Sequence, residues 1–227
     1  MRVLDTILVH LDVEDLKRQL RLNTKTGSSA DVGELVELAE SLIQPKAVYA
    51  VSYIDQRGDD TVEVNGVTFT SRVLRVNLDT VERVFPFIIT IGKALEDKAS
   101  SSGDLLRQFY LETMGDMALR ASRRYLEEHL KRHYGLGQLS RMNPGSLEDW
   151  PVTQQRPLFS LFGNVEELIG VRLTENMLMI PRKSVSGILF PTEVMFFSCQ
   201  LCPREGCPAR KAPHDETLRE KYGLGEE

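Results

Sequence analysis

The chain has 227 residues, of which 41% are hydrophobic and 27% charged, and its formal net charge is −5. This composition is typical of a soluble globular protein of one large domain or two small ones, and it lacks the basic excess of nucleic-acid-binding proteins. No run of about 18 apolar residues occurs, so we expect no membrane span. The N-terminus has acidic side chains within its apolar part and no small-residue cleavage site. We therefore expect no signal peptide and a cytoplasmic protein with reduced thiols.

In chain order, the first half predicts two helices and then a segment rich in strands. Residues 12–22 and 31–44 carry apolar side chains at helical spacing, and Pro45 ends the second helix. Asn65-Gly66 lies between two runs of β-favouring residues, which is a strong signal for a hairpin. Further strands are expected at 47–54, 73–78 and 86–92.

The second half predicts one long helix at 104–134, followed by a loop with a short helix and then short strands. The long helix has an apolar stripe, and we expect its opposite face to be in contact with solvent. Strands mix with helices without regular alternation, which favours an α+β fold with antiparallel pairing. The charged face holds Arg120, Arg123, Arg124, Glu127, Glu128 and Lys131, and the strands are expected at 169–173, 176–180, 184–190 and 194–199.

The only three cysteines of the chain, Cys199, Cys202 and Cys207, lie within nine residues. An odd number argues against a disulfide framework, and such clustering is typical of a zinc site or an iron–sulfur cluster. Three thiolates are one ligand short of a closed site. His214 is a candidate fourth ligand; otherwise one position is open or is filled by a partner. Three unligated cysteines are the remaining alternative.

The common catalytic motifs are absent. The chain has no Walker A loop, no GxGxxG after a strand, no HExxH and no GxSxG. It also lacks the Asp-x-His-x-x-Gly pattern by which many corrinoid proteins supply an axial histidine. We therefore predict no catalytic side chain, and no corrinoid held by this chain in that mode.

The loop that begins at Arg141 is the first candidate binding motif. Arg141, Asn143, Pro144 and Gly145 offer a guanidinium that suits a carboxylate and a glycine that lets a ligand approach the backbone. An ordinary surface turn is the alternative, since Asn-Pro-Gly-Ser is common turn chemistry.

A second candidate follows at Ser184 and Ser186, whose hydroxyls lie on one side of a strand, with Gly187 permitting close approach of a ligand. The alternative is an edge strand with ordinary serines. Phe196 and Phe197 are suited to stack on a planar base, or else belong to the core.

These segments resemble the C-terminal activation domain of cobalamin-dependent methionine synthase, and still more the stand-alone proteins similar to it. The family's first motif is Arg-Pro-x-Pro-Gly-Tyr-Pro, which Arg141, Pro144 and Gly145 match; its second contains the Ser-Val-Ser-Gly found at 184–187. The resemblance is best over about residues 85–198 and does not extend to the cysteine segment. We accordingly divide the chain into an activation-domain-like part, 1–198, and a cysteine-containing tail, 199–227.

The resemblance implies a C-shaped α+β fold with a twisted antiparallel sheet and flanking helices. It also implies that S-adenosylmethionine binds in a shallow groove. Arg141 would contact its carboxylate, Pro144 and Gly145 would line the groove, and Phe196 and Phe197 would correspond to the family's aromatic pair. Two departures matter: Ser146 replaces the family tyrosine, and Asp12 is the only candidate for the aspartate that binds the ligand's amine.

The function implied by the resemblance is reductive methylation of an inactive corrinoid carried by a partner. That partner is a corrinoid methyltransferase, with methionine synthase first, or a corrinoid protein, and flavodoxin or ferredoxin donates the electron. The chain would then be a methyltransferase component that supplies position. We hypothesise that the cysteines bind an iron–sulfur cluster that passes the electron. The alternatives are a metal-bearing electron-transfer or interaction module without S-adenosylmethionine, and a structural zinc protein.

Overall fold

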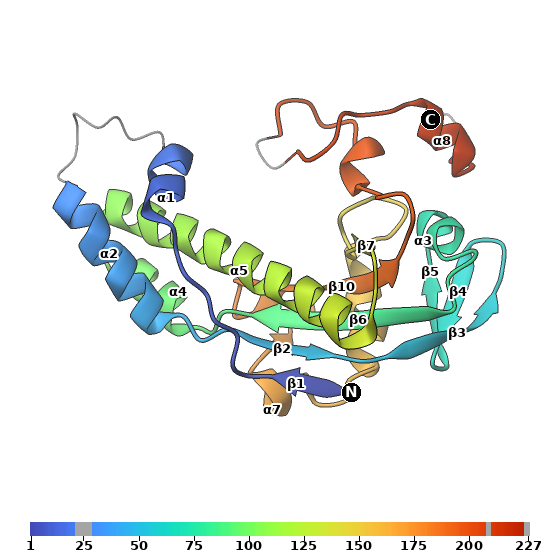
Figure 1. Cartoon of the computed structure of the whole chain (residues 1–227), viewed down its shortest axis with the longest axis horizontal. Coiled ribbons are helices and arrows are strands. Elements are labelled where there is room, and N and C mark those ends of the chain that lie inside the picture. The colour runs from blue at the N-terminus through green and yellow to red at the C-terminus, as the bar shows by residue number, and fades with distance from the viewer. Residues whose placement is uncertain (21–28, 208–209, 225–227) are drawn as a thin grey trace.

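The structure, a computed structural model, describes residues 1–20, 29–207 and 210–224. Its centre is an antiparallel sheet of eight strands (Figure 1). A separate ribbon pairs β8 (Arg172–Leu173) with β9 (Met179–Ile180). The strands of the main sheet are β1 (Arg2–Leu4), β2 (Lys46–Tyr49), β3 (Ser52–Arg57), β4 (Thr61–Val64), β5 (Val67–Thr70), β6 (Arg83–Thr90), β7 (Leu139–Met142) and β10 (Ser184–Pro191).

Strand β6 is the middle of the sheet because it pairs along both edges. One edge carries β10, and the other is shared by β2 at residues 87–90 and by β3 at residues 83–84. Every residue from Val84 to Thr90 is buried, which explains why the sequence shows a continuous apolar run here instead of alternation. The sheet therefore divides beyond β6 into one wing that ends at β1 and another that ends at the β4–β5 hairpin.

Eight helices surround the sheet in the described part of the chain, and none of them is long and apolar enough to cross a membrane. Short 3-10 turns lie at Val152–Gln154 and Ser198–Gln200. The helices are α1 (Val13–Gln19), α2 (Ser29–Leu42), α3 (Arg72–Asn77), α4 (Ala94–Ser100), α5 (Leu105–Tyr134), α6 (Gln155–Ser160), α7 (Val165–Ile169) and α8 (Thr217–Lys221).

Helix α5 lies across one face of the sheet and also packs against α1, α2 and α4 (Figure 1). It begins where the Asp104 side chain accepts hydrogen bonds from two backbone N–H groups, and it ends at Gly135, whose φ is 62°. Leu126 and Leu130 pack in one cluster with the buried aromatic side chains of β6, whereas Met114 packs with α2 and α4. The fold is thus α+β, with a curled antiparallel sheet and flanking helices, as the sequence predicted.

The long helix, the two N-terminal helices and the Asn65-Gly66 hairpin are confirmed. The single strand expected at 47–54 is instead two strands, β2 and β3, which pair with different parts of β6. Residues 139–142 form β7, a strand that the sequence did not predict.

Two predicted strands are wrong. Residues 73–77 lie in α3 and Leu78 caps its end; at its start the Ser71 side chain accepts a hydrogen bond from the Leu74 N–H. Leu74 and Leu78 are both buried one helical turn apart, so packing overrode the β-favouring valines of this segment. Residues 194–199 contain no strand and lead into the 3-10 turn at Ser198–Gln200.

The C-terminal tail packs on the same core as the sheet, although its sequence is polar. Leu201 and Tyr222 are buried in the cluster that contains the side chains of β4 and α3. The Tyr222 hydroxyl donates to Oδ1 of Asn77 at 3.2 Å, and its carbonyl oxygen accepts from Nε of Arg72 at 2.8 Å. The division of the chain at residue 198 stays a prediction, but these contacts fasten the tail to the domain.

Candidate functional site

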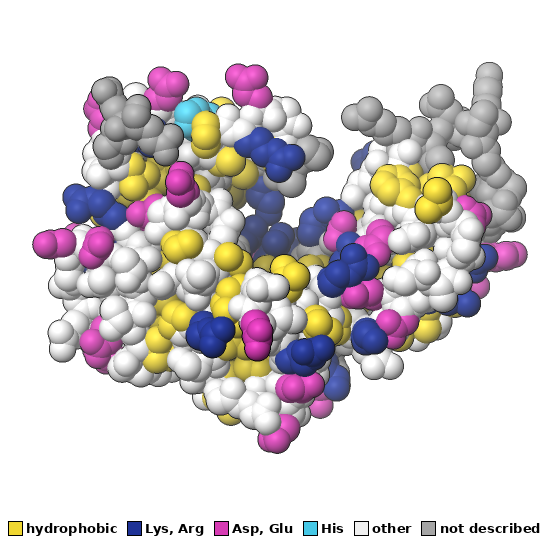
Figure 2. Space-filling model, turned by 180° about the vertical axis from the view of Figure 1, so that it is seen from behind, with side chains coloured by type: hydrophobic (Ala, Val, Ile, Leu, Met, Phe, Trp, Pro, Cys, Tyr) yellow, Lys and Arg dark blue, Asp and Glu magenta, His cyan; other side chains and the backbone are white. Residues whose placement is uncertain are grey.

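A groove opens between α1, the charged face of α5, strand β7 and the tail. It consists of two adjoining hollows of about 450 and 340 Å³, which share Arg141, Met195, Phe197 and Lys211. Figure 2 shows the molecule hollowed between two masses, with Lys and Arg side chains inside the hollow. The groove therefore combines an aromatic side chain with a concentration of positive charge.

Arg141 lies at the junction of the two hollows. Strand β7 pairs with β10 so that Arg141 is opposite Leu189, which fixes the backbone from which the guanidinium extends. Its Nη1 donates to Oε1 of Glu127 on α5 at 2.8 Å, and the side chain is 21% exposed. The guanidinium is thus held in place and still faces the groove.

Arg123 adds a second guanidinium from α5. Its Nε is buried and has no hydrogen-bond partner, because the Glu127 oxygen lies 3.8 Å away. Burial, together with the neighbouring Arg141, lowers the pKa of Arg123, although a guanidinium stays charged near neutral pH. A buried donor of this kind is costly to leave unsatisfied, which favours an acceptor from a ligand.

Lys211 reaches the groove from the tail. Partial desolvation, followed by the charges of Arg141 and Arg123, lowers the pKa of Lys211 to about 8. Its backbone N–H lies 3.4 Å from Sγ of Cys199. Lys211 therefore belongs to the same electrostatic cluster as the two arginines, although it lies 70 residues after Arg141 in sequence.

Asn143 and Ser146 also line the groove, and the first of them anchors the motif loop to β10. Nδ2 of Asn143 donates to the carbonyl oxygen of Ser186 at 2.6 Å, and the Ser146 hydroxyl donates to the carbonyl oxygen of Asn143 at 2.7 Å. A Cβ on Gly187 would lie 2.5 Å from Nδ2 of Asn143. The glycine of the Ser-Val-Ser-Gly motif is therefore needed for the close approach of β10 and the loop.

Ser184 and Ser186 are not among the residues that line the groove. Both are buried: the Ser184 hydroxyl donates to the carbonyl oxygen of Pro181 at 2.7 Å, and the Ser186 hydroxyl donates to Oε1 of Gln155 at 3.4 Å. In this structure both serine hydroxyls are therefore engaged by other groups of the protein.

Asp12 lines the same hollow as Arg141. It caps α1, where its Oδ1 accepts a hydrogen bond from the backbone N–H of Asp15 at 2.8 Å. This hydrogen bond lowers the pKa of Asp12, so the carboxylate is ionised near neutral pH. A carboxylate from the N-terminal segment thus lies in the groove with cations from α5, β7 and the tail.

The two phenylalanines differ. Phe197 lines both hollows, whereas Phe196 is buried and packs edge-on against Tyr222, with ring centroids 5.6 Å apart. Phe196 still borders the tail-side hollow, and its backbone N–H donates to the Ser140 hydroxyl at 2.8 Å. Phe197 is therefore the aromatic side chain better placed for contact with a ligand.

The cysteine segment is where the sequence predicted a metal centre. Within the described ranges, no three Cys, His, Asp or Glu side chains lie together in a way that could hold a metal ion. Cys199, Cys202 and Cys207 are free thiols, and Nε2 of His214 is buried without a hydrogen-bond partner. The predicted zinc or iron–sulfur centre, and the electron-transfer module that depends on it, therefore have no structural support.

An arginine organises this segment instead. The Arg210 guanidinium donates to the carbonyl oxygens of Cys199 at 2.9 Å and Cys202 at 3.1 Å, and also to that of Arg204. Donor groups of one planar side chain thus satisfy carbonyls from several turns of the loop.

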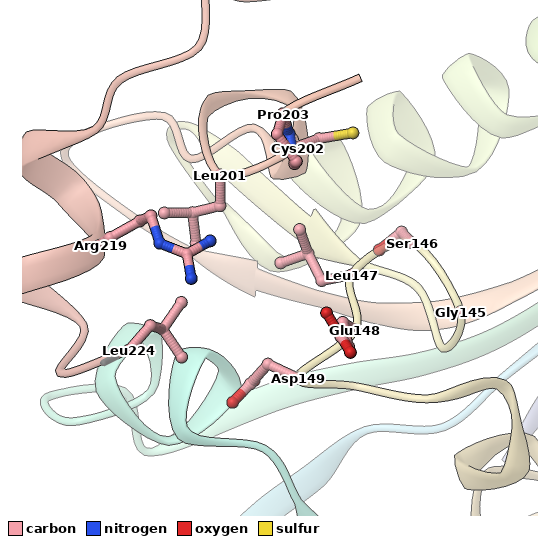
Figure 3. Close-up of a pocket in the computed structure, with 10 residues that line it drawn as sticks. All are labelled: Gly145, Ser146, Leu147, Glu148, Asp149, Leu201, Cys202, Pro203, Arg219 and Leu224. Atoms are coloured by element: carbon pink, nitrogen blue, oxygen red, sulfur yellow. The ribbon is translucent and has the colours of Figure 1, made fainter. Parts of the chain in front are cut away.

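A third hollow of about 440 Å³ lies between the motif loop and the tail (Figure 3). Gly145 and Ser146 line it from the motif loop, and Cys202 and Arg219 line it from the tail. Gly145 has a φ of 82°, and its N–H donates to the carbonyl oxygen of Trp150 at 2.7 Å, so it serves the turn. Pro144 is not among the residues lining any of these three hollows.

Sequence reasoning missed three of the residues in the groove: Arg123, Glu127 and Lys211. The first two belong to the face of α5 that we expected to be solvated. Their spacing of four residues, with arginines on either side, was visible in the sequence, but the same pattern is ordinary on exposed helices. Lys211 gave no signal at all.

Comparison with known proteins gives a family match and a similar solved structure. Residues 140–209 match a family described as vitamin B12 dependent methionine synthase, activation domain. Among solved structures, the chain is similar to the crystal structure of the MetH reactivation domain bound to AdoHcy. The TM-score is 0.60 at 17% sequence identity, over 87% of this chain and 81% of that chain. No curated protein matches the chain.

The predicted resemblance to the activation domain is thus confirmed, in sequence over one segment and in fold over most of the chain. One expectation is corrected: the match at 140–209 runs through all three cysteines, which we had placed outside the resemblance.

Proposed function

We propose that the chain binds S-adenosylmethionine in the groove and supports reductive methylation of a corrinoid carried by a partner methyltransferase. The convergence of Asp12, Arg141 and Phe197 on one groove carries this proposal. These residues come from three distant segments, and each was singled out from the sequence as a contact for one part of this ligand. We expect the chain to carry out this role in the cytoplasm.

The chemistry of the groove fits the ligand. The Arg141 guanidinium matches a carboxylate, the ionised Asp12 matches an ammonium group, and Phe197 offers a face for the adenine ring. The unsatisfied Nε of Arg123 is a further donor for an anionic group. The AdoHcy bound to the similar MetH reactivation domain has the same amino-acid and adenosine parts.

In the proposed reaction, the corrinoid and S-adenosylmethionine are both substrates. One electron from a separate donor, such as flavodoxin or ferredoxin, reduces cob(II)alamin to cob(I)alamin. The cobalt then takes the methyl group, which leaves methylcobalamin and S-adenosylhomocysteine. No proton is transferred, so the chain needs no acid or base; its residues hold and orient the methyl donor. Methionine synthase is the first candidate for the partner.

Isothermal titration calorimetry with S-adenosylmethionine and S-adenosylhomocysteine tests the binding. We expect both to bind, and we expect Arg141→Gln to weaken each by at least about tenfold, because it removes a charge-assisted hydrogen bond. Arg172→Gln, which changes an exposed arginine of β8, is the matched control and should bind as the wild type does.

Absence of binding to the wild-type chain would overturn the proposal. A second measurement addresses the reaction itself. With a reductant and a methionine synthase that lacks its own activation domain, the chain should transfer the labelled methyl group of S-adenosylmethionine to the corrinoid.

A further inference from the structure

We infer that Lys211, carried by the tail, joins Arg123 and Arg141 in an anion-binding subsite that holds the carboxylate of the ligand's amino-acid part. The inference rests on the proposed function and deepens it, because it assigns to the tail a direct part in selecting the ligand. It also gives the cysteine segment, which the Arg210 side chain organises, a role that needs no metal: positioning Lys211.

The first argument is the charge balance at the junction of the two hollows. Arg141 and Lys211 line both hollows, and Arg123 lines the one beside α1. The carboxylate that pairs with both Arg123 and Arg141 is Glu127. Glu127 is committed to Arg141 at 2.8 Å and lies too far from Nε of Arg123 for a hydrogen bond. Among these groups, positive charge therefore exceeds negative charge, and an added anion would be attracted.

The second argument is the lining of the tail-side hollow. Among the residues that the structure describes, no Asp or Glu lines it, whereas Arg141, Lys211, Asn143, Ser146 and Ser198 do. The hydroxyls of Ser146 and Ser198 lie 3.3 Å apart, one from the motif loop and one from the tail. Glu127 engages Nη1 of Arg141 from outside this hollow, and the other donors of Arg141, with those of Lys211, favour an anionic group over a cation such as a sulfonium.

The third argument is the way in which the tail presents Lys211. The preceding residue, Arg210, is anchored to the carbonyl oxygens of Cys199 and Cys202. The N–H of Lys211 itself points to Sγ of Cys199, and Cys199 borders the same hollow. The Arg210 side chain and the Lys211 N–H thus both hold this stretch of the tail against Cys199, where the Lys211 residue lines both hollows.

The test separates the carboxylate from the rest of the ligand. S-adenosylhomocysteine carries the amino-acid part, and 5′-methylthioadenosine has the same nucleoside and sulfur without it. Calorimetry of Lys211→Gln with both ligands should show binding of S-adenosylhomocysteine weakened by about fivefold or more. Binding of 5′-methylthioadenosine should change by less than about twofold. Lys211→Arg, which keeps the charge, should retain the affinity of the wild type.

Lys221→Gln is the matched control, because it removes another exposed tail lysine that lines neither hollow. If Lys211→Gln binds S-adenosylhomocysteine as the wild type does, or weakens both ligands equally, the inference is wrong while the proposed function stands. If the wild-type chain binds neither ligand, the proposed function fails, and the inference fails with it.

Discussion

Individual charged residues of this protein fall into two kinds, compensated and uncompensated. Lys183, which precedes β10, is compensated: it pairs with Glu112 at 2.9 Å and with Asp116 at 2.6 Å, both on α5. Arg182 completes that network with Glu96 and Glu112. At the groove, by contrast, Arg123 has a buried Nε without a partner. The Lys183 network satisfies its charged groups within the fold, whereas Arg123 keeps a donor that its distant partner Glu127, 3.8 Å away, does not satisfy.

The compensated network predicts a pH dependence of stability. Burial alone would raise the pKa of Glu112, but the hydrogen bond and charge of Lys183, with help from Arg182, lower it below 4.5 overall. A carboxyl with a lowered folded-state pKa contributes stability above its unfolded pKa, and loses that contribution as the pH falls through the folded value.

We therefore expect Glu112→Gln to be less stable than the wild type in urea at pH 7, with the difference shrinking as the pH falls below about 4. Glu128→Gln is the control, because Glu128 is 59% exposed in its pair with Lys131. A difference in stability that stays constant from pH 7 to pH 3 would contradict this reading.

The motif loop and strand β10 form one unit at the scale of secondary-structure elements. Strand β7, which carries Arg141, pairs with β10, and Asn143 then bonds to the backbone of β10 beside Gly187. The two sequence motifs therefore contact each other. The loop that begins at Arg141 supplies groove residues, and the Ser-Val-Ser-Gly motif supplies Gly187, which has no side chain where the loop approaches β10.

Gly187→Ala should break this contact. The added Cβ would lie 3.1 Å from Cε1 of Phe87, 2.5 Å from Nδ2 of Asn143 and closer still to the Met142 carbonyl oxygen. We expect a loss of about 1–3 kcal/mol of unfolding free energy, and weaker ligand binding because the loop that holds Arg141 must shift.

Gly33→Ala is a matched control, since a Cβ there meets no atom within 4 Å. Chemical denaturation and calorimetry measure the two effects. If Gly187→Ala were as stable as the wild type and bound ligand equally well, the close approach of β10 to Asn143 would not be needed for stability or for binding.

At the scale of the whole molecule, the tail completes both the core and the groove. Tyr222 is 5% exposed, packs against Phe196 and bonds to Asn77 and Arg72. Lys211 lies between this anchor and the cysteine segment, eleven residues before Tyr222. We therefore expect the position of this groove residue to depend on the Tyr222 contact.

Tyr222→Ala should therefore release the tail. We expect the free energy of unfolding of the docked tail to fall by about 3 kcal/mol, because a buried aromatic side chain is lost. Trypsin should then cleave faster after Arg210 and Lys211, and S-adenosylhomocysteine should bind more weakly. Tyr222→Phe keeps the packing and loses one hydrogen bond, so its cleavage should stay close to that of the wild type. Equal protection of the tail in Tyr222→Ala would show that Tyr222 does not anchor it.

Much of the fold and part of the site were determined by local sequence. The helical spacing over 104–134, the Asn65-Gly66 turn and the motif around Arg141 each act within one segment, so they could be read without the tertiary structure. Tertiary structure alone decided that residues 73–77 are helical and that the charged face of α5 lines a groove. Those outcomes depend on packing between segments far apart in the chain, and neither propensity nor spacing within one segment contains that information.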